Sequence, residues 1–340
     1  MNKFLIHHRS KHHSNNSGYG KLIDYLDVKT IYGSISVPYK VAKIISSLSS
    51  KTAGNYDSAS VLKEIELFKQ LRNNNDKRHI VHYLNAERDI RHLVNFQKRF
   101  PLTTFCASFH KPPNILKEAI TTTKYLKKLH GAIAVGSNQV AFLQEWLQLD
   151  NVTYIPHGVD TNYFVPDASK KEEKTLLFVG QHLRDFETFN YCIPKIAAAI
   201  KNLKVNVIIH PAYVHKVLPH KSIQIYSGVN DAQLLDFYQR ASMLFLPLVD
   251  VTACNSILEG LACGLPIVST KVGGNATYLE GTSNILLPKD DLDSYIAAVV
   301  ETINTQDKLT AIGASSRKKA MDYDWKNIAA CVNGFYNKLL

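Results

Sequence analysis

The chain has 340 residues, of which 45% are hydrophobic and 20% are charged. This composition supports about two folded domains and excludes a disordered protein. No run approaches the roughly 18 consecutive apolar residues of a membrane-spanning helix. The apolar run at 4–6 is too short for a secretory signal, so we expect an intracellular, cytoplasmic protein. Five scattered cysteines without a Cys-x-x-Cys pair exclude a disulfide framework and the usual structural zinc site.

The positive charge is concentrated in the first half of the chain. The net charge is +11, and residues 1–155 hold 22 Lys and Arg against 11 Asp and Glu, whereas residues 156–340 hold 18 of each. A one-sided basic field attracts an anionic partner such as nucleic acid, an acidic membrane surface or a phosphorylated substrate. A basic domain without a particular partner explains the charge equally well.

The first half alternates short apolar runs with helical patterns. Buried strands are predicted at 3–7, 79–83, 102–106, 131–135 and 152–155, and helices at 20–27, 60–72 and 137–147. Parallel strands joined by helices are typical of an α/β domain.

The second half restarts the same alternation after the charged, proline-containing stretch 166–174, which marks a joint. Asp231 is the expected N-cap of the helix that begins there. Parallel sheets bind ligands beyond the carboxyl ends of their strands, so we look for chemistry in those loops. The predicted strands are 175–179, 204–209, 222–226, 242–246, 266–269 and 284–287, and the helices are 187–200, 231–241, 256–263 and 291–304.

The loop and helix within residues 250–274 carry the densest chemical signal. A helix begins near Asn255 or Ser256, and the N–H groups of its first turn form a potential anion site. Glu259 lies about one turn further along, within reach of a ribose hydroxyl pair. However, Ser256 and Glu259 also match a capping box, in which the glutamate only binds the Ser256 backbone. Both interpretations remain open on local pattern.

Several stretches together resemble the retaining GT-B glycosyltransferases of family 4, the glycosyl transferases group 1. The similar stretches are 155–166 (IPHGVDTNYFVP), 177–180, 228–231, 259–268, 17–20 and 109–112. The resemblance implies two Rossmann-like parallel-sheet domains that face each other across a cleft. An acceptor domain would span 1–157, a donor domain would span 158–324, and a C-terminal helix at 325–340 would return to the first domain.

The resemblance also implies roles in binding a nucleotide-sugar donor. Glu259 would hold the ribose hydroxyls, and the backbone at Ser256 and Ile257 would meet the diphosphate. Gly228 and Val229 would present backbone groups to the base.

Further implied roles concern the phosphates and the transferred sugar. Arg184, shortly after Gly180, would neutralise the phosphates. Gly18 and Gly20 would let the first-domain backbone approach the donor, although they equally suit a turn before the predicted helix. His110, at the ligand edge of the first sheet, would lie beside the sugar; an ordinary packed histidine is the alternative.

The sequence departs from the family pattern at two places. The family often has a second glutamate eight residues before Glu259, where this chain has Val251. We expect either Asp250 or the pair Thr252 and Asn255 to contact the sugar instead. The family's phosphate lysine also has no counterpart shortly after the arginine.

Two weaker candidates concern the acceptor. Glu87 follows a predicted strand and could line the acceptor pocket or be a surface carboxylate. His13 belongs to a histidine-rich segment that fits no standard zinc spacing, so we interpret it as a basic loop near acceptor or phosphate and expect no metal.

The sequence therefore predicts a retaining, metal-independent transfer of a hexose, such as glucose from a UDP-sugar, to a saccharide or lipid-pyrophosphate-linked acceptor in glycan biosynthesis. Contact of the basic first domain with an acidic membrane surface would accompany it. A same-fold epimerase or phosphorylase is the first alternative. A basic nucleic-acid-binding protein is the second, although no nucleic-acid-binding motif is recognisable and we expect no such partner.

Overall fold

A computed structural model of the chain describes residues 1–7, 16, 18–35, 37–49 and 56–340. The described chain divides into two compact units, each with its own parallel sheet and hydrophobic core. The first unit contains Gly18–His157 and Trp325–Leu340 together with the first strand, and the second contains Gly158–Asp324. Asn16 also belongs to the second unit, and apart from this segment the chain passes between the units at His157–Gly158 and again at Asp324–Trp325.

The sheet of the first unit has six parallel strands in the order β2-β1-β3-β4-β5-β6. The strands are short because each crosses only the buried layer, and β3 and β5 are buried along their whole length. Their bounds are β1 (Asn2–Ile6), β2 (Lys29–Ile31), β3 (His79–Tyr83), β4 (Thr103–Phe109), β5 (Gly131–Ala134) and β6 (Val152–Tyr154).

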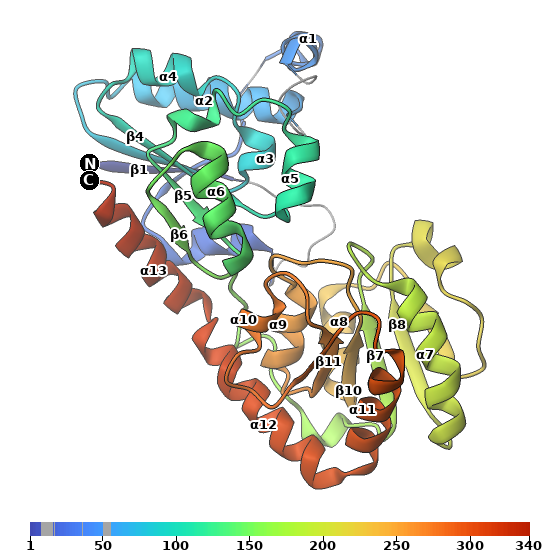
Figure 1. The fold of residues 1–340 in the computed structure, drawn as a ribbon. Coiled ribbons are helices and arrows are strands. Elements are labelled where there is room, and N and C mark those ends of the chain that lie inside the picture. The colour runs from blue at the N-terminus through green and yellow to red at the C-terminus, as the bar shows by residue number, and fades with distance from the viewer. Residues whose placement is uncertain (8–15, 17, 36, 50–55) are drawn as a thin grey trace. The chain divides into compact units, whose positions relative to one another are not determined.

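Helices surround this sheet, and the helix from the far end of the chain is one of them (Figure 1). That helix, α13 (Trp325–Lys338), buries Trp325 and Tyr336, and Asn333 accepts a hydrogen bond from Lys3 of β1 at 3.0 Å. The other helical elements are η1 (Tyr19–Tyr25), α1 (Tyr39–Ser49), α2 (Ser58–Arg72), α3 (Ala86–Asp89), α4 (Leu93–Arg99), α5 (Pro113–Ala119), η2 (Leu126–Lys128), η3 (Ser137–Gln139) and α6 (Val140–Leu147).

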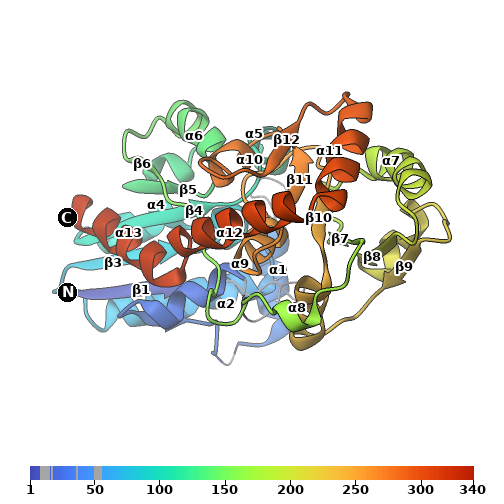
Figure 2. The same ribbon diagram turned by 90° about the horizontal axis from the view of Figure 1, so that it is seen from below.

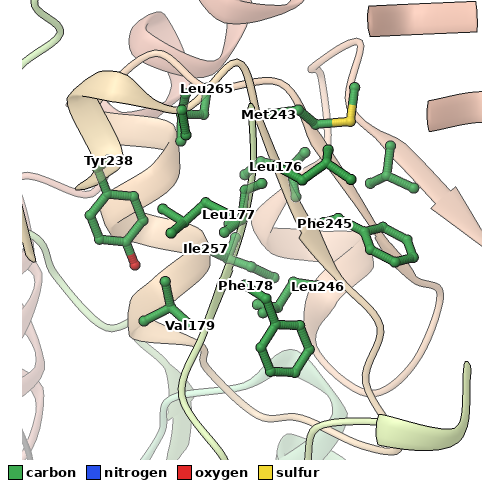
Figure 3. Packing of buried hydrophobic residues seen from close by; sticks show 14 of the residues in the cluster. Leu176, Leu177, Phe178, Val179, Tyr238, Met243, Phe245, Leu246, Ile257 and Leu265 are labelled. Atoms are coloured by element: carbon green, nitrogen blue, oxygen red, sulfur yellow. The ribbon is translucent and has the colours of Figure 1, made fainter. Parts of the chain in front are cut away.

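The sheet of the second unit also has six parallel strands, in the order β12-β11-β10-β7-β8-β9. Apolar side chains of β7 and β10 meet Ile257 and Leu265 in its core, and Tyr238 lies at the border of that cluster (Figure 3). The strand bounds are β7 (Thr175–Val179), β8 (Lys204–Ile208), β9 (Ile223–Tyr226), β10 (Met243–Leu246), β11 (Ile267–Thr270) and β12 (Ile285–Leu287).

Helices connect the strands of the second unit as well. Asn230 caps the helix that follows β9, because its side chain accepts the Gln233 N–H at 2.9 Å. The helical elements are η4 (Ala168–Lys170), α7 (Phe186–Ala199), η5 (Pro211–Lys216), α8 (Asp231–Arg240), α9 (Asn255–Ala262), α10 (Asn275–Tyr278), α11 (Leu292–Asn304) and α12 (Gln306–Asp322).

The structure confirms the predicted α/β class with two parallel sheets and a C-terminal helix that belongs to the first of them. The strand β2 was not predicted, and the expectation that Asp231 caps α8 is wrong by one residue, since Asn230 does so. Every helix in the described part of the chain is too short or too polar to cross a lipid bilayer.

Candidate active site

The second sheet has a topological switch point between β7 and β10. The chain leaves β7 toward β8 on one side, whereas β10 continues toward β11 on the other side. Ligands of open α/β sheets bind beyond the carboxyl ends of the two strands at such a point. The loops that begin there are residues 180–185 after β7 and 247–254 after β10.

Arg184 reaches across this switch point. Its Nε donates to the Val179 carbonyl at 2.8 Å and its Nη1 donates to the His182 carbonyl at 2.9 Å. Its Nη2 donates to Ser256 Oγ, at the start of α9, at 3.1 Å. The structure therefore joins two residues that the sequence analysis assigned to the phosphates from separate stretches.

Gly180 makes room for this guanidinium. Its φ of +86° favours glycine, and a Cβ at this position would lie 2.8 Å from Arg184 Nη2. A side chain would push the guanidinium away from Ser256, so the glycine is required both for its backbone conformation and for the close approach.

The first turn of α9 has unpaired N–H groups. Its N-cap residue is Cys254, whose side chain makes no capping bond. Ile257 N–H donates to the Cys254 carbonyl at 3.0 Å, whereas the N–H groups of Asn255 and Ser256 have no acceptor among the described residues. These two amides and the helix dipole favour an anion. They are better placed for a phosphate than the predicted Ile257 amide.

Glu259 is not part of a capping box. The cap residue is Cys254 rather than Ser256, so that interpretation is wrong. The carboxylate is instead 3% exposed and accepts a hydrogen bond from Tyr238 Oη of α8 at 2.7 Å. Burial and the nearby Glu259 charge raise the pKa of Tyr238 well above its usual value, so the phenol remains a donor.

The loop before α9 is held in a tight backbone arrangement. Val251 is buried in the core, and its N–H donates to Asp250 Oδ1 at 2.7 Å. Thr252 is also buried, at 4% exposure, whereas Asp250 is partly exposed. A Cβ at Gly273, where φ is +50°, would lie 1.9 Å from the Val251 carbonyl. Asp250 and Asn255, which are both partly exposed, are therefore more accessible candidates for contacting a sugar than Thr252.

Gly228 and Val229 form a separate group after β9. Gly228 has a φ of +69° and open space around its Cβ position, while Val229 packs against the core cluster. Strand β8 lies between β9 and β7, and no hydrogen bond links this turn to Arg184 within the described residues.

In the first unit, His110 follows β4 directly and is held by hydrogen bonds from its side chain and its backbone. Its Nε2 donates to the Leu84 carbonyl at 2.6 Å, and its backbone N–H donates to Glu87 Oε1 at 2.6 Å. Glu87 also accepts the Lys111 N–H at 2.9 Å and is 2% exposed, so the surface interpretation of Glu87 is wrong. This carboxylate fixes the loop that carries His110.

Tyr19, between the two predicted glycines, is a functional candidate that the sequence analysis missed. Its ring meets the His110 ring edge-on with centroids 4.6 Å apart, and its hydroxyl bonds Ser108 Oγ at 3.1 Å. Gly18 has a φ of −71°, which any residue can adopt, and Gly20 lies within η1. His13 lies outside the described residues.

A buried chain of hydrogen bonds continues from Ser108 to the C-terminal helix. His82 Nε2 lies 2.8 Å from Ser108 Oγ, and its Nδ1 lies 2.8 Å from Tyr336 Oη of α13. Burial, followed by the charge of His110, lowers the pKa of His82 to about 3. His82 is therefore neutral and links β3, β4 and α13.

Comparisons with known proteins place a family match within the second unit. Residues 173–305 match the family described as glycosyl transferases group 1. D-inositol 3-phosphate glycosyltransferase 2 of Catenulispora acidiphila is 26% identical over 133 residues, which are 38% of this chain and 31% of that protein. Phosphatidyl-myo-inositol mannosyltransferase of Mycolicibacterium smegmatis is 22% identical over 227 residues, 62% of this chain and 58% of that protein. Both matches span less than two thirds of the relative's length.

Solved structures share the fold over the whole chain. Sucrose-phosphate synthase of Thermosynechococcus elongatus superimposes with a TM-score of 0.71 at 14% identity, covering 100% of this chain and 99% of that one. HepE of Anabaena, solved in complex with UDP, has a TM-score of 0.69 at 12% identity, covering 99% and 100%. These similarities confirm the predicted GT-B fold class.

Proposed function

Because residues 173–305 belong to the glycosyl transferases group 1 family, we propose that the protein is a retaining glycosyltransferase. It moves a hexose from a nucleoside diphosphate sugar, with UDP-glucose as the first candidate donor, to a saccharide or lipid-linked acceptor in glycan biosynthesis. The relative named phosphatidyl-myo-inositol mannosyltransferase supports a lipid-linked acceptor, and the UDP complex of HepE supports a uridine nucleotide.

One observation carries this proposal: Arg184 and the start of α9 meet at the switch point of the second sheet. When the bond from the anomeric carbon to the diphosphate breaks, negative charge grows on the β-phosphate. The guanidinium and the two unpaired amides would stabilise that charge without rearranging. Since they supply the positive charge, the proposal includes no metal ion and no further cofactor.

The transfer would proceed on one face of the sugar. The acceptor oxygen would form the new bond to the anomeric carbon on the side that the phosphate leaves, and its proton would pass to a phosphate oxygen. Glu259 would hold the ribose, and Asp250 or Asn255 would contact the sugar. His110, whose Nε2 proton is bound to Leu84, would stand beside the sugar as part of the first unit.

The direct test combines donor binding with product analysis. A melting-temperature screen against nucleoside diphosphates and their sugars should select one donor, because a bound ligand raises stability by mass action. With that donor and a panel of sugars and lipid-linked sugars, NMR should show an unchanged anomeric configuration in the product. Conversion of the donor to an epimer without an acceptor, or cleavage by inorganic phosphate, would contradict transfer.

The substitution Arg184→Lys tests the contact between Arg184 and the start of α9, on which the proposal rests. Lysine keeps the charge but cannot reach the Val179 and His182 carbonyls and Ser256 together, so we expect turnover to fall roughly 10- to 100-fold. The matched control is Arg240→Lys on α8, where the guanidinium forms only surface ion pairs. Equal turnover of the two variants would remove Arg184 from the mechanism.

We also propose that α1 carries the contact with an acidic membrane surface. Residues 28–56 contain four lysines and neither Asp nor Glu. The helix buries Ala42 and Ser46 and exposes Ile44 at 60% and Val41 at 44%, with Lys43 exposed beside them. An exposed apolar and basic face is suited to the headgroup region of an anionic bilayer.

A further inference from the structure

One connection in the second sheet lacks the helix that its neighbours have. The crossovers from β7 to β8 and from β9 to β10 contain the long helices α7 and α8. The crossover from β8 to β9 contains only η5, six residues long. Helices in such crossovers normally cover a face of the sheet, so a short one leaves apolar surface uncovered.

The uncovered surface is one face of the edge strand β9. Tyr226 points to the covered face, because its ring packs against Phe237 of α8 with centroids 4.6 Å apart. Side chains alternate along a strand, so Ile223 and Ile225 occupy the opposite face. Ile225 is 37% exposed, and Leu218 beyond η5 is 60% exposed. Figure 2 shows β8 and β9 at the edge of this unit.

A pocket of about 480 Å³ lies on this face. The pocket is open to solvent over much of its extent, and its volume falls within the range of small-ligand sites. Its apolar lining consists of Val214, Val217, Leu218, Pro219, Ile223 and Ile225. Two histidines, His215 and His220, complete the lining.

Basic residues flank the β9 pocket along the chain. Residues 188–230 contain five lysines and three histidines but neither Asp nor Glu. Lys221 follows His220 and is exposed, and it forms no ion pair with any residue in the described ranges. Lys216, beside His215, lies over the Tyr213 ring at 5.4 Å. A group with a negative charge would be attracted to this rim.

We propose that the β9 pocket binds an amphiphilic anion, whose apolar chain or ring occupies the pocket while its phosphate or carboxylate meets Lys221 and His220. The limited volume favours a single small molecule over a bilayer surface or a partner helix. A second copy of the chain is disfavoured, because a two-fold contact here would bring the lysines together. The site is separate from the proposed donor site and does not depend on the proposed function.

Binding of dodecyl phosphate to the full chain, followed by calorimetry below the micelle concentration, tests the proposal. We expect saturable binding of one molecule per chain. Inorganic phosphate and dodecanol should each bind at least roughly tenfold more weakly, since each lacks one half of the ligand. Leu218→Asp and Lys221→Glu should each weaken binding roughly tenfold or more. Leu102→Asp, at a position in the first unit that is 48% exposed, is the control and should change nothing.

Three results would overturn the β9 pocket as a small-ligand site. The first is the absence of saturable binding to a chain whose melting curve shows that it is folded. The second is binding that both pocket variants leave unchanged. The third is binding through the same residues to a different partner. This partner would be either a vesicle of anionic phospholipid, if only vesicles bind, or an acidic amphipathic peptide, if the peptide binds more tightly.

Discussion

At the scale of single residues, Glu259 is held by a partner from another helix rather than by its own helix start. Tyr238 Oη orients the carboxylate from the side of α8. The local pattern around Ser256 was equally consistent with a capping box, and nothing in it identifies a tyrosine 21 residues earlier. The contact is tertiary, so the sequence could suggest Glu259 but not how it is positioned.

Glu259→Gln separates a ribose role from a structural one. Glutamine keeps the size and an oxygen for Tyr238, so the fold should survive with a small change in melting temperature. If Glu259 binds the ribose, the unmodified protein should prefer UDP over 2′,3′-dideoxy-UDP by roughly tenfold or more, and the variant should lose this preference. The measurement is calorimetry with both nucleotides. An unchanged preference in the variant would leave Glu259 a purely structural residue.

Glu87 is a second residue whose surroundings could not be predicted from the local sequence. Its position after a strand suggested either a pocket residue or a surface carboxylate, because sequence does not reveal burial of a single charged side chain. The structure makes it a buried acceptor for two consecutive backbone N–H groups, those of His110 and Lys111. Asn230 differs from the expected Asp231 for a simpler reason, since both residues are good caps and only the backbone decides between them.

At the scale of elements, the contact between the loop after β10 and the turn after β11 depends on a single glycine. Gly273→Ala would place a methyl group against the Val251 carbonyl and displace the loop that carries Asp250. The matched control is Gly281→Ala, because Gly281 also has a positive φ, +74°, but has nothing within 4 Å of its Cβ position. We expect Gly273→Ala to lower the free energy of unfolding by about 1–3 kcal/mol more than the control, as measured by urea denaturation. Equal losses would mean that the loop accommodates the methyl group.

The buried chain through His82 predicts a pH dependence of stability. The pKa of His82 lies at about 3 in the folded protein against 6.5 ordinarily, so below pH 6.5 the unfolded chain takes up a proton that the folded chain does not. The stabilising contribution is complete above pH 6.5 and is lost as the pH falls toward 3, by up to about 1.4 kcal/mol per pH unit. The variant His82→Gln should be less stable at pH 7 but should show a shallower decline. Urea denaturation of both proteins between pH 7 and 4 measures the difference in their free energies of unfolding. The carboxylates common to both proteins contribute equally and cancel in this difference. If the two free energies decline in parallel, His82 is not a neutral buried residue.

The elements that the sequence identified are those whose own side chains fill the core. Strands such as β3 and β7 are buried along their length, so their apolar runs stand out. Strand β2 was missed because only Ile31 of its three residues is buried. The sequence predicted no helix between the strands at 204–209 and 222–226, but it did not reveal the short η5 there or the strand order of the sheet.

At the scale of the whole molecule, the proposed contact of α1 with an acidic membrane surface predicts a measurable effect of charge on vesicle binding. Ile44→Asp places a negative charge on the exposed face of α1 without disturbing buried residues, since Ile44 is 60% exposed. In sedimentation with vesicles rich in phosphatidylglycerol, we expect it to weaken binding roughly tenfold or more. Vesicles of phosphatidylcholine should bind little of either protein, and added salt should release the unmodified one.

Leu102→Asp is again the matched control, because it makes the same change at an exposed apolar position of the first unit that lies outside α1. If it weakens vesicle binding as much as Ile44→Asp does, the effect is one of total charge, and α1 has no special part in it.

The position of α13 in the first unit has a consequence for biosynthesis. Residues 158–324 are contiguous, so the second unit has its full set of strands and helices as soon as that stretch has left the ribosome. The first unit begins earlier in the chain but is complete only after α13 has been synthesised. Trp325 and Tyr336 of this helix are buried, and Tyr336 is a hydrogen-bond partner of His82. The unit that begins earlier in the chain is therefore the last to complete its fold, and until then the surfaces of β1 and β3 that α13 contacts are exposed on the nascent chain.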